Sequence, residues 1–66
     1  MKLSGRLRAA FWRATHRHKK GGLYRLLRTG VIEADMTEVA IYDDQSGKTW
    51  VRPLAEFNDG RFTPLR

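Results

Sequence analysis

The sequence predicts a mainly β domain with one N-terminal helix, an α+β fold whose strands form a small, partly open SH3-like β-barrel with a short helical turn. Two observations predict this class. The stretch TEVAIYDD alternates apolar and polar side chains, and turn residues separate it from a second alternating stretch, KTWVRP. The first 14 residues instead place apolar side chains at helical spacing. Since the chain has 66 residues and no cysteine, we expect one small domain without disulfides or a thiolate metal site.

The N-terminal helix is expected over residues 1–17 and is amphipathic and cationic. Ser4 is a candidate cap, and the basic side chains fall largely off the apolar face. That face carries, at spacings of three or four residues, Leu3, Leu7, Ala10, Phe11 and Ala14. A helix of this length is marginal in water. We therefore expect its apolar face to dock on the rest of the chain or on a partner.

Residues 18–66 are expected to form the barrel-like domain as one compact unit. Gly21 and Gly22 end the helical pattern. The bulky residues of LYRLLRTGVI then predict a strand that is bulged or bent near Gly30.

The two alternating stretches are expected to pair as a β-hairpin. Val39 and Ile41 share one face of its first strand, and Ala40 and Tyr42 share the opposite face. The turn DDQSG supplies Asp side chains that bond nearby backbone groups, and Gly47, which adopts a positive φ without strain.

After the hairpin, proline residues mark the ends of the predicted elements. Pro53 ends the second strand because it lacks an N–H group, and PLAEF then fits one helical turn with Leu54 and Phe57 on the same side. The turn NDG precedes RFTPL, which is expected to be a short edge strand because Pro64 cannot pair on one side.

The basic residues are concentrated in the first half of the chain. Residues 1–32 hold nine Lys or Arg and no acid, whereas the rest holds four basic and seven acidic residues, so the halves carry +9 and −3 of the net +6. Such asymmetry is typical of a protein with a polyanionic partner, although a solvated basic face also serves solubility. The candidate phosphate-binding residues are Arg6, Arg13, Arg17, Lys19, Lys20, Arg25 and Arg28.

A second candidate site is an aromatic and basic cluster on the hairpin. Neighbouring side chains on one face of a hairpin lie within contact distance, so we expect Tyr42, Lys48, Trp50 and Arg52 to cluster. Tyr24, from the preceding strand, is included in this candidate site. If this face is open, its rings form a platform on which single-stranded bases stack. If the N-terminal helix covers it, Trp50 packs against Leu7 or Phe11, and the need of the helix for a dock favours this arrangement.

Trp12 lies at the edge of the apolar face of the predicted helix. There it either stays exposed, as part of an interaction surface among arginines, or covers helix backbone.

The order of the motifs resembles a bacterial and phage family, domain of unknown function 1653. The resemblance covers about residues 16–65 and is carried by HRHKKGGLYRLL, AIYDD, KTWVRPLAEF and GRFTPL. The residues at family positions are His18, Lys20, Gly21, Tyr24, Tyr42, Trp50, Val51, Arg52, Pro53, Leu54 and Phe57. His16 and Lys19 stand where the family usually has aromatic residues. The resemblance implies a compact β-barrel-like fold and brings no catalytic residues.

No set of residues predicts catalysis or metal binding. His16 and His18 have no cysteine and only distant carboxylates as companions, whereas a metal site needs three or four ligands. Asp43 and Asp44 are adjacent in a predicted turn, where Asp is favoured for local hydrogen bonds. The double glycine lacks the spacing of a P-loop. We therefore expect no enzyme, cofactor or metal site.

We expect a cytoplasmic, non-catalytic binding module that contacts nucleic acid or another polyanion through its basic N-terminal half. One alternative is a protein adaptor or inhibitor module, of a size that phages encode, which docks through the cationic helix. Another is a small-ligand-binding protein that uses the aromatic and basic cluster. No membrane partner is expected, because no apolar run is long enough to span a bilayer. The helix leaves both a monomer and a helix-mediated homodimer open.

Overall fold

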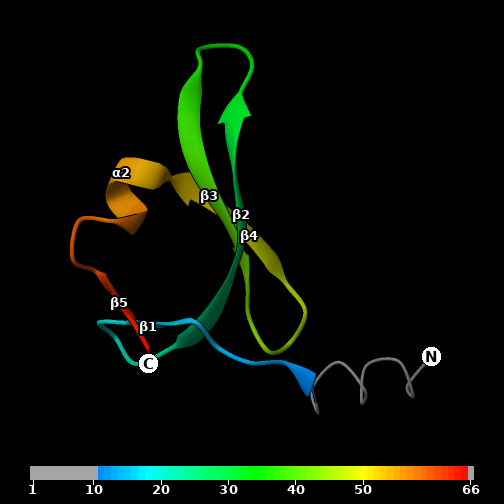
Figure 1. Ribbon diagram of the computed structural model, residues 1–66, viewed down its shortest axis with the longest axis vertical. Coiled ribbons are helices and arrows are strands. Elements are labelled where there is room, and N and C mark those ends of the chain that lie inside the picture. Colours follow the sequence, from blue (N-terminus) through cyan, green and yellow to red (C-terminus); the bar gives the residue numbers. More distant parts are fainter. Residues whose placement is uncertain (1–10, 66) are drawn as a thin grey trace.

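The computed structural model describes residues 11–65 as a mainly β fold with one short helix (Figure 1). The elements are β1 (His16–His18), β2 (Leu23–Ile32), β3 (Thr37–Asp43), β4 (Thr49–Pro53), α2 (Leu54–Phe57) and β5 (Phe62–Pro64). The strands form one antiparallel sheet in the order β4-β3-β2-β1-β5. The predictions of a mainly β fold, of the hairpin, of the helical turn and of a short last strand at a sheet edge are confirmed.

The long strand β2 joins the two parts of the sheet, because it pairs with β1 near its start and with β3 along most of its length. It curves strongly in Figure 1. A register shift between Leu26 and Arg28 places the bulge at Leu27, so the predicted bulge near Gly30 is wrong. Gly30 pairs regularly with Val39. Its lack of a side chain leaves space for Ile41, since a Cβ atom at Gly30 would lie 3.4 Å from Cδ1 of Ile41.

The hairpin of β3 and β4 has the predicted faces. Tyr42 lies opposite Trp50 and Ala40 lies opposite Arg52, so these four side chains share one face. In the turn, Oδ1 of Asp44 accepts hydrogen bonds from the backbone N–H groups of Ser46 and Lys48, at 3.0 and 3.2 Å. Gly47 has a φ of +94°. The turn is therefore built by the Asp side chain and the glycine that its sequence predicts.

The core is a small cluster of rings on one face of the sheet. The buried residues are Ala40, Tyr42, Phe57 and Phe62, with Tyr24, Leu26 and Leu54 packed against them. The rings of Phe57 and Phe62 stack at 4.4 Å between centroids, and Tyr42 lies 5.2 and 5.4 Å from them. Helix α2 is a single turn, and it is stabilised by the packing of Leu54 and Phe57 in this cluster.

The N-terminal segment differs from the predicted helix. Residues 1–10 lie outside the described part of the chain, Phe11 is helical, and His16–His18 form β1 where the helix was expected to continue. Long-range pairing explains the difference, because β1 lies between β2 and β5. The backbone of Thr15 extends this pairing by donating to Tyr24 and accepting from Leu65, both at 2.9 Å. No helix in the described residues is long and apolar enough to cross a membrane.

Candidate polyanion-binding surface

Six basic side chains are exposed and have no ion-pair partner among residues 11–65; one is Lys48, and the other five belong to the basic N-terminal half. These five are Arg13, Arg17, Lys19, Lys20 and Arg28. Arg17 lies on the opposite face of β1 from His16 and His18, whose rings contact Phe57 and Phe62 in the core. Arg17 therefore points to solvent, because the alternation of the strand sends the two histidines inward. Arg6, also predicted to bind phosphate, lies outside the described residues.

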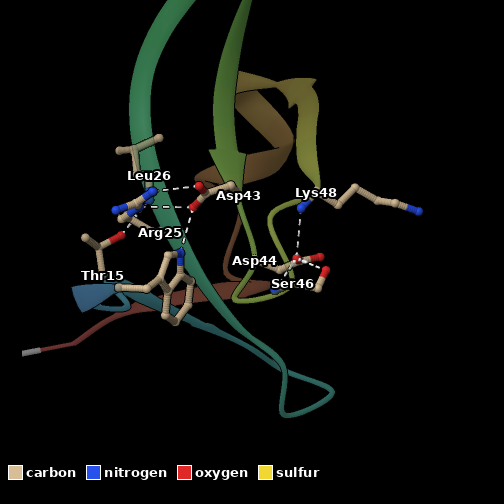
Figure 2. A network of polar contacts seen from close by, with 8 residues as sticks. Thr15, Arg25, Leu26, Asp43, Asp44, Ser46 and Lys48 are labelled. Atoms are coloured by element: carbon tan, nitrogen blue, oxygen red, sulfur yellow. Dashed lines mark hydrogen bonds and ion pairs between the residues drawn. The ribbon is translucent and has the colours of Figure 1, made fainter. Parts of the chain in front are cut away.

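Arg25, which was predicted to bind phosphate, forms an ion pair with Asp43. Its Nε and Nη2 atoms donate to the two carboxylate oxygens at 3.1 and 2.7 Å, a bidentate pair shown in Figure 2. Asp43 is completely buried, and this hydrogen bond raises the pKa of Arg25 above its ordinary value. We assign Arg25 a structural role.

Trp12 belongs to the same network. Its Nε1 atom donates to Oδ1 of Asp43 at 2.9 Å, and the residue is only 9% exposed. The exposed position considered for Trp12 is therefore wrong: the ring packs on the sheet and holds the segment before β1 to the end of β3.

The predicted aromatic and basic cluster is brought together, but most of it is core. Tyr42 is 4% exposed and its hydroxyl accepts a hydrogen bond from Nε of Arg52 at 3.2 Å, while Tyr24 lies 5.5 Å from Tyr42, ring to ring. Trp50 remains 40% exposed, with Nζ of Lys48 over its ring at 5.0 Å. An open platform on this face is thus reduced to a single indole ring.

The covering of Trp50 by the N-terminal segment is not observed in the described residues. Phe11, one of the two expected partners, is itself 77% exposed, and the other, Leu7, lies outside the described part. The indole Nε1 of Trp50 instead donates to Oδ2 of Asp44 at 2.9 Å, which fixes the ring against its own hairpin turn. This contact contributes to holding the pKa of Asp44 down at about 2, after the larger effect of the Ser46 hydroxyl.

Four basic residues surround His18, and their gathering there was not predicted from the sequence. We call His18, Lys19, Lys20, Arg52 and Arg61 the His18 cluster. Burial, and then the charges of these four cations, lower the pKa of His18. Arg61 was missed because it lies far from the basic half of the chain. The only feature of the sequence that could have pointed to Arg61 is its position between a turn glycine and Phe62, a core residue.

The acidic residues of the β2–β3 hairpin lie at the other end of the molecule from the β1–β2 turn (Figure 1). Glu33, Asp35 and Glu38 are all exposed there. An open depression between the start of β3 and α2 is lined mainly by apolar and uncharged residues, among them Met36, Pro53 and Leu54. Among residues 11–65, no group of three or more His, Asp or Glu could hold a metal ion.

A model of the family described as "Protein of unknown function (DUF1653)" matches residues 14–62 of the chain. This range contains the whole sheet except the last two residues of β5, and it includes the His18 cluster. No curated protein and no solved structure matches the chain.

Proposed function

The chain belongs to the DUF1653 family, and from its surface we propose that it is a non-catalytic module that binds nucleic acid through the exposed cations of its N-terminal half. One observation carries the proposal: Arg13, Arg17, Lys19, Lys20 and Arg28 are exposed without a carboxylate partner in the described residues, and three of the seven acids lie on the far β2–β3 hairpin. A surface of this kind attracts phosphates and releases their counterions.

The binding is electrostatic, and it therefore depends steeply on salt. For single-stranded nucleic acid, each neutralised phosphate contributes about −0.7 to the slope of log K against log salt concentration. Five contacts would weaken binding roughly a hundredfold between about 50 and 200 mM salt. Trp50 also exposes its ring, but Nζ of Lys48 lies over that ring at 5.0 Å, so we assign stacking on Trp50 no part in the proposal.

Fluorescence anisotropy of labelled single-stranded and duplex oligonucleotides tests this function with a matched pair of variants. Arg17→Glu and Lys48→Glu change the net charge equally, but Arg17 belongs to the proposed surface and Lys48 extends away from Arg25 and Asp43 (Figure 2). We expect Arg17→Glu to weaken binding about tenfold and Lys48→Glu to weaken it less than about threefold. Equal losses in the two variants, or no binding at low salt, would contradict the proposal.

We further propose that the curved sheet is a partly open SH3-like barrel. The support is that β2 pairs with β3 on one side and with β1 on the other, and that β5 extends the sheet beyond β1. Such a module acts in the cytoplasm, where nucleic acid is accessible and disulfides are not needed.

A protein partner is the second candidate function. The observation that favours it is Phe11, a large apolar side chain exposed beside Arg13 at the start of the described chain. In that case the protein is an adaptor or inhibitor whose N-terminal segment docks on a partner. A small-ligand site has less support, because Tyr24 and Tyr42 pack in the core.

A further inference from the structure

The His18 cluster joins side chains from separate parts of the chain. Lys19 and Lys20 lie in the β1–β2 turn, Arg52 in β4, and Arg61 directly before β5. The backbone N–H of Lys19 donates to the carbonyl of Arg61 at 2.8 Å, so the two turns lie side by side. His18 itself pairs with Phe62 across β1 and β5.

Two members of this cluster, His18 and Arg52, pack on the ring of Phe62. The ring of His18 meets it edge-on, at 4.8 Å between centroids, and the guanidinium of Arg52 lies over it at 5.6 Å. Because Phe62 is buried, the histidine and the arginine are held in place by the core. The two exposed lysines of the turn add their charges beside these two groups, which is a favourable arrangement for holding an anion.

The cluster has hydrogen-bond donors left over for a ligand. Nδ1 of His18 accepts from the backbone N–H of Lys20 at 3.1 Å, so the neutral ring carries its proton on Nε2. Arg52 uses Nε for Tyr42 and Nη1 for Glu56, and among the described residues no hydrogen bond occupies its Nη2. The ammonium groups of Lys19 and Lys20 have no ion pair in the described residues.

The charge of the cluster is not balanced internally. Arg52 lies 3.2 Å from Glu56, and Arg61 lies 2.9 Å from Asp59 and 3.8 Å from Glu56. Four cations therefore face two carboxylates, which leaves a net charge of +2 with His18 neutral. The ring of Tyr24 is the remaining titratable group packed on His18, at 6.4 Å.

We propose that the His18 cluster is a binding site for one phosphate group, which we call the seat, with His18, Arg52 and the two lysines as its hydrogen-bond donors. This inference rests on the proposed function for the source of the phosphate, which is the bound nucleic acid. It goes further by assigning one discrete position on the molecule to one phosphate. His18 then takes up a proton when the seat fills, because the anion favours the charged imidazolium against the cations around it.

The two histidines allow the test and its control to be made in one sample. His16 lies two residues away, with Nδ1 2.7 Å from the Thr15 hydroxyl and its ring 4.9 Å from Phe57, and burial lowers its pKa as well. The causes that lower the pKa of His16 do not include the four cations. The probes are inorganic phosphate and sulfate at constant ionic strength, followed by NMR of both imidazole rings against pH.

We expect either anion to raise the pKa of His18 by about one unit and to leave that of His16 unchanged. Sulfate is included because its charge does not change over this range. Since the pKa is higher in the bound state, affinity for sulfate rises as the pH falls from about 8 towards 6. It levels off below the pKa of free His18, which itself lies below 6.5.

Lys20→Gln should remove most of the anion effect on His18, and the matched control Lys48→Gln should preserve it. Equal pKa changes at His16 and His18, or none at either, would overturn the seat. That result would leave nucleic-acid binding through Arg17 standing, because the anisotropy experiment does not involve His18. Conversely, a response of His18 to sulfate without any oligonucleotide binding would support the seat and contradict the proposed function.

Oligonucleotides of one sequence with a 5′-phosphate or a 5′-hydroxyl identify the source. A larger pKa change with the 5′-phosphate assigns the seat to a terminal phosphate, and equal changes assign it to internal phosphates. Oligonucleotide binding that leaves His18 unchanged in both cases would contradict the seat.

Discussion

The buried carboxylate of Asp43 binds one of the basic side chains that were predicted to contact phosphate, Arg25. It accepts hydrogen bonds from Trp12 and Arg25, and so withdraws one arginine from an otherwise exposed basic half. A buried charge pair of this kind costs desolvation when it forms, but removing one partner leaves the other charge buried without compensation. Asp43 is therefore a structural residue that shapes the candidate surface indirectly.

Asp43→Ala should lower the free energy of unfolding by about 3–5 kcal/mol, because the guanidinium of Arg25 and the indole N–H of Trp12 lose their acceptor. Asp43→Asn keeps an oxygen for Trp12 and should cost less. Urea unfolding followed by far-UV circular dichroism measures both, and if the alanine variant does not fold, the asparagine variant still gives a value. An alanine variant within about 0.5 kcal/mol of the parent protein would contradict this role.

Asp43 and Asp44 show which contacts could be predicted from the sequence and which could not. The adjacent acids were interpreted together as turn residues, and Asp44 does build the turn. Asp43 instead lies at the end of β3 and faces Arg25 in the neighbouring strand. Local propensity describes Asp44, whereas the partner of Asp43 depends on the register of β2 against β3.

At the scale of elements, the strands with a clear two-residue alternation were predictable and β1 was not. Its three residues, HRH, are too few to show a pattern, and its strand conformation depends on β2 and β5 on either side. The same long-range pairing created the His18 cluster by bringing Arg61 beside Lys19. The charge pattern alone pointed to the basic half, but it predicted neither the pairing of Arg25 with Asp43 nor the gathering of basic residues around His18.

The hairpin turn between β3 and β4 can be tested as an element. Gly47 has a φ of +94°, where an added Cβ atom is strained, so Gly47→Ala should destabilise the domain by about 1–2 kcal/mol. Gln45→Ala, in the same turn and exposed, should change stability by less than about 0.5 kcal/mol. Both values come from urea unfolding; a Gly47 variant as stable as the Gln45 variant would show that the turn tolerates another conformation.

At the scale of the whole molecule, part of the charge is separated along its length, although Glu56 and Asp59 pair with arginines near the basic turn. The acidic β2–β3 hairpin and the β1–β2 turn with Lys19 and Lys20 lie at opposite ends (Figure 1), and the net charge is +6. A polyanion is attracted to one end and repelled from the other, so the bound molecule should adopt one orientation. This arrangement follows from topology, because β2 runs from the basic turn to the acidic one.

Mapping a short single-stranded oligonucleotide on the protein by NMR tests the central claim most directly. The account predicts that backbone amide signals change around Arg13, Arg17, Lys19, Lys20 and Arg28, and that the changes fade as salt is raised. The signals of the acidic turn at residues 33–36 should stay where they are. Changes centred on that turn or on the depression near Met36, or no changes at low salt, would contradict it.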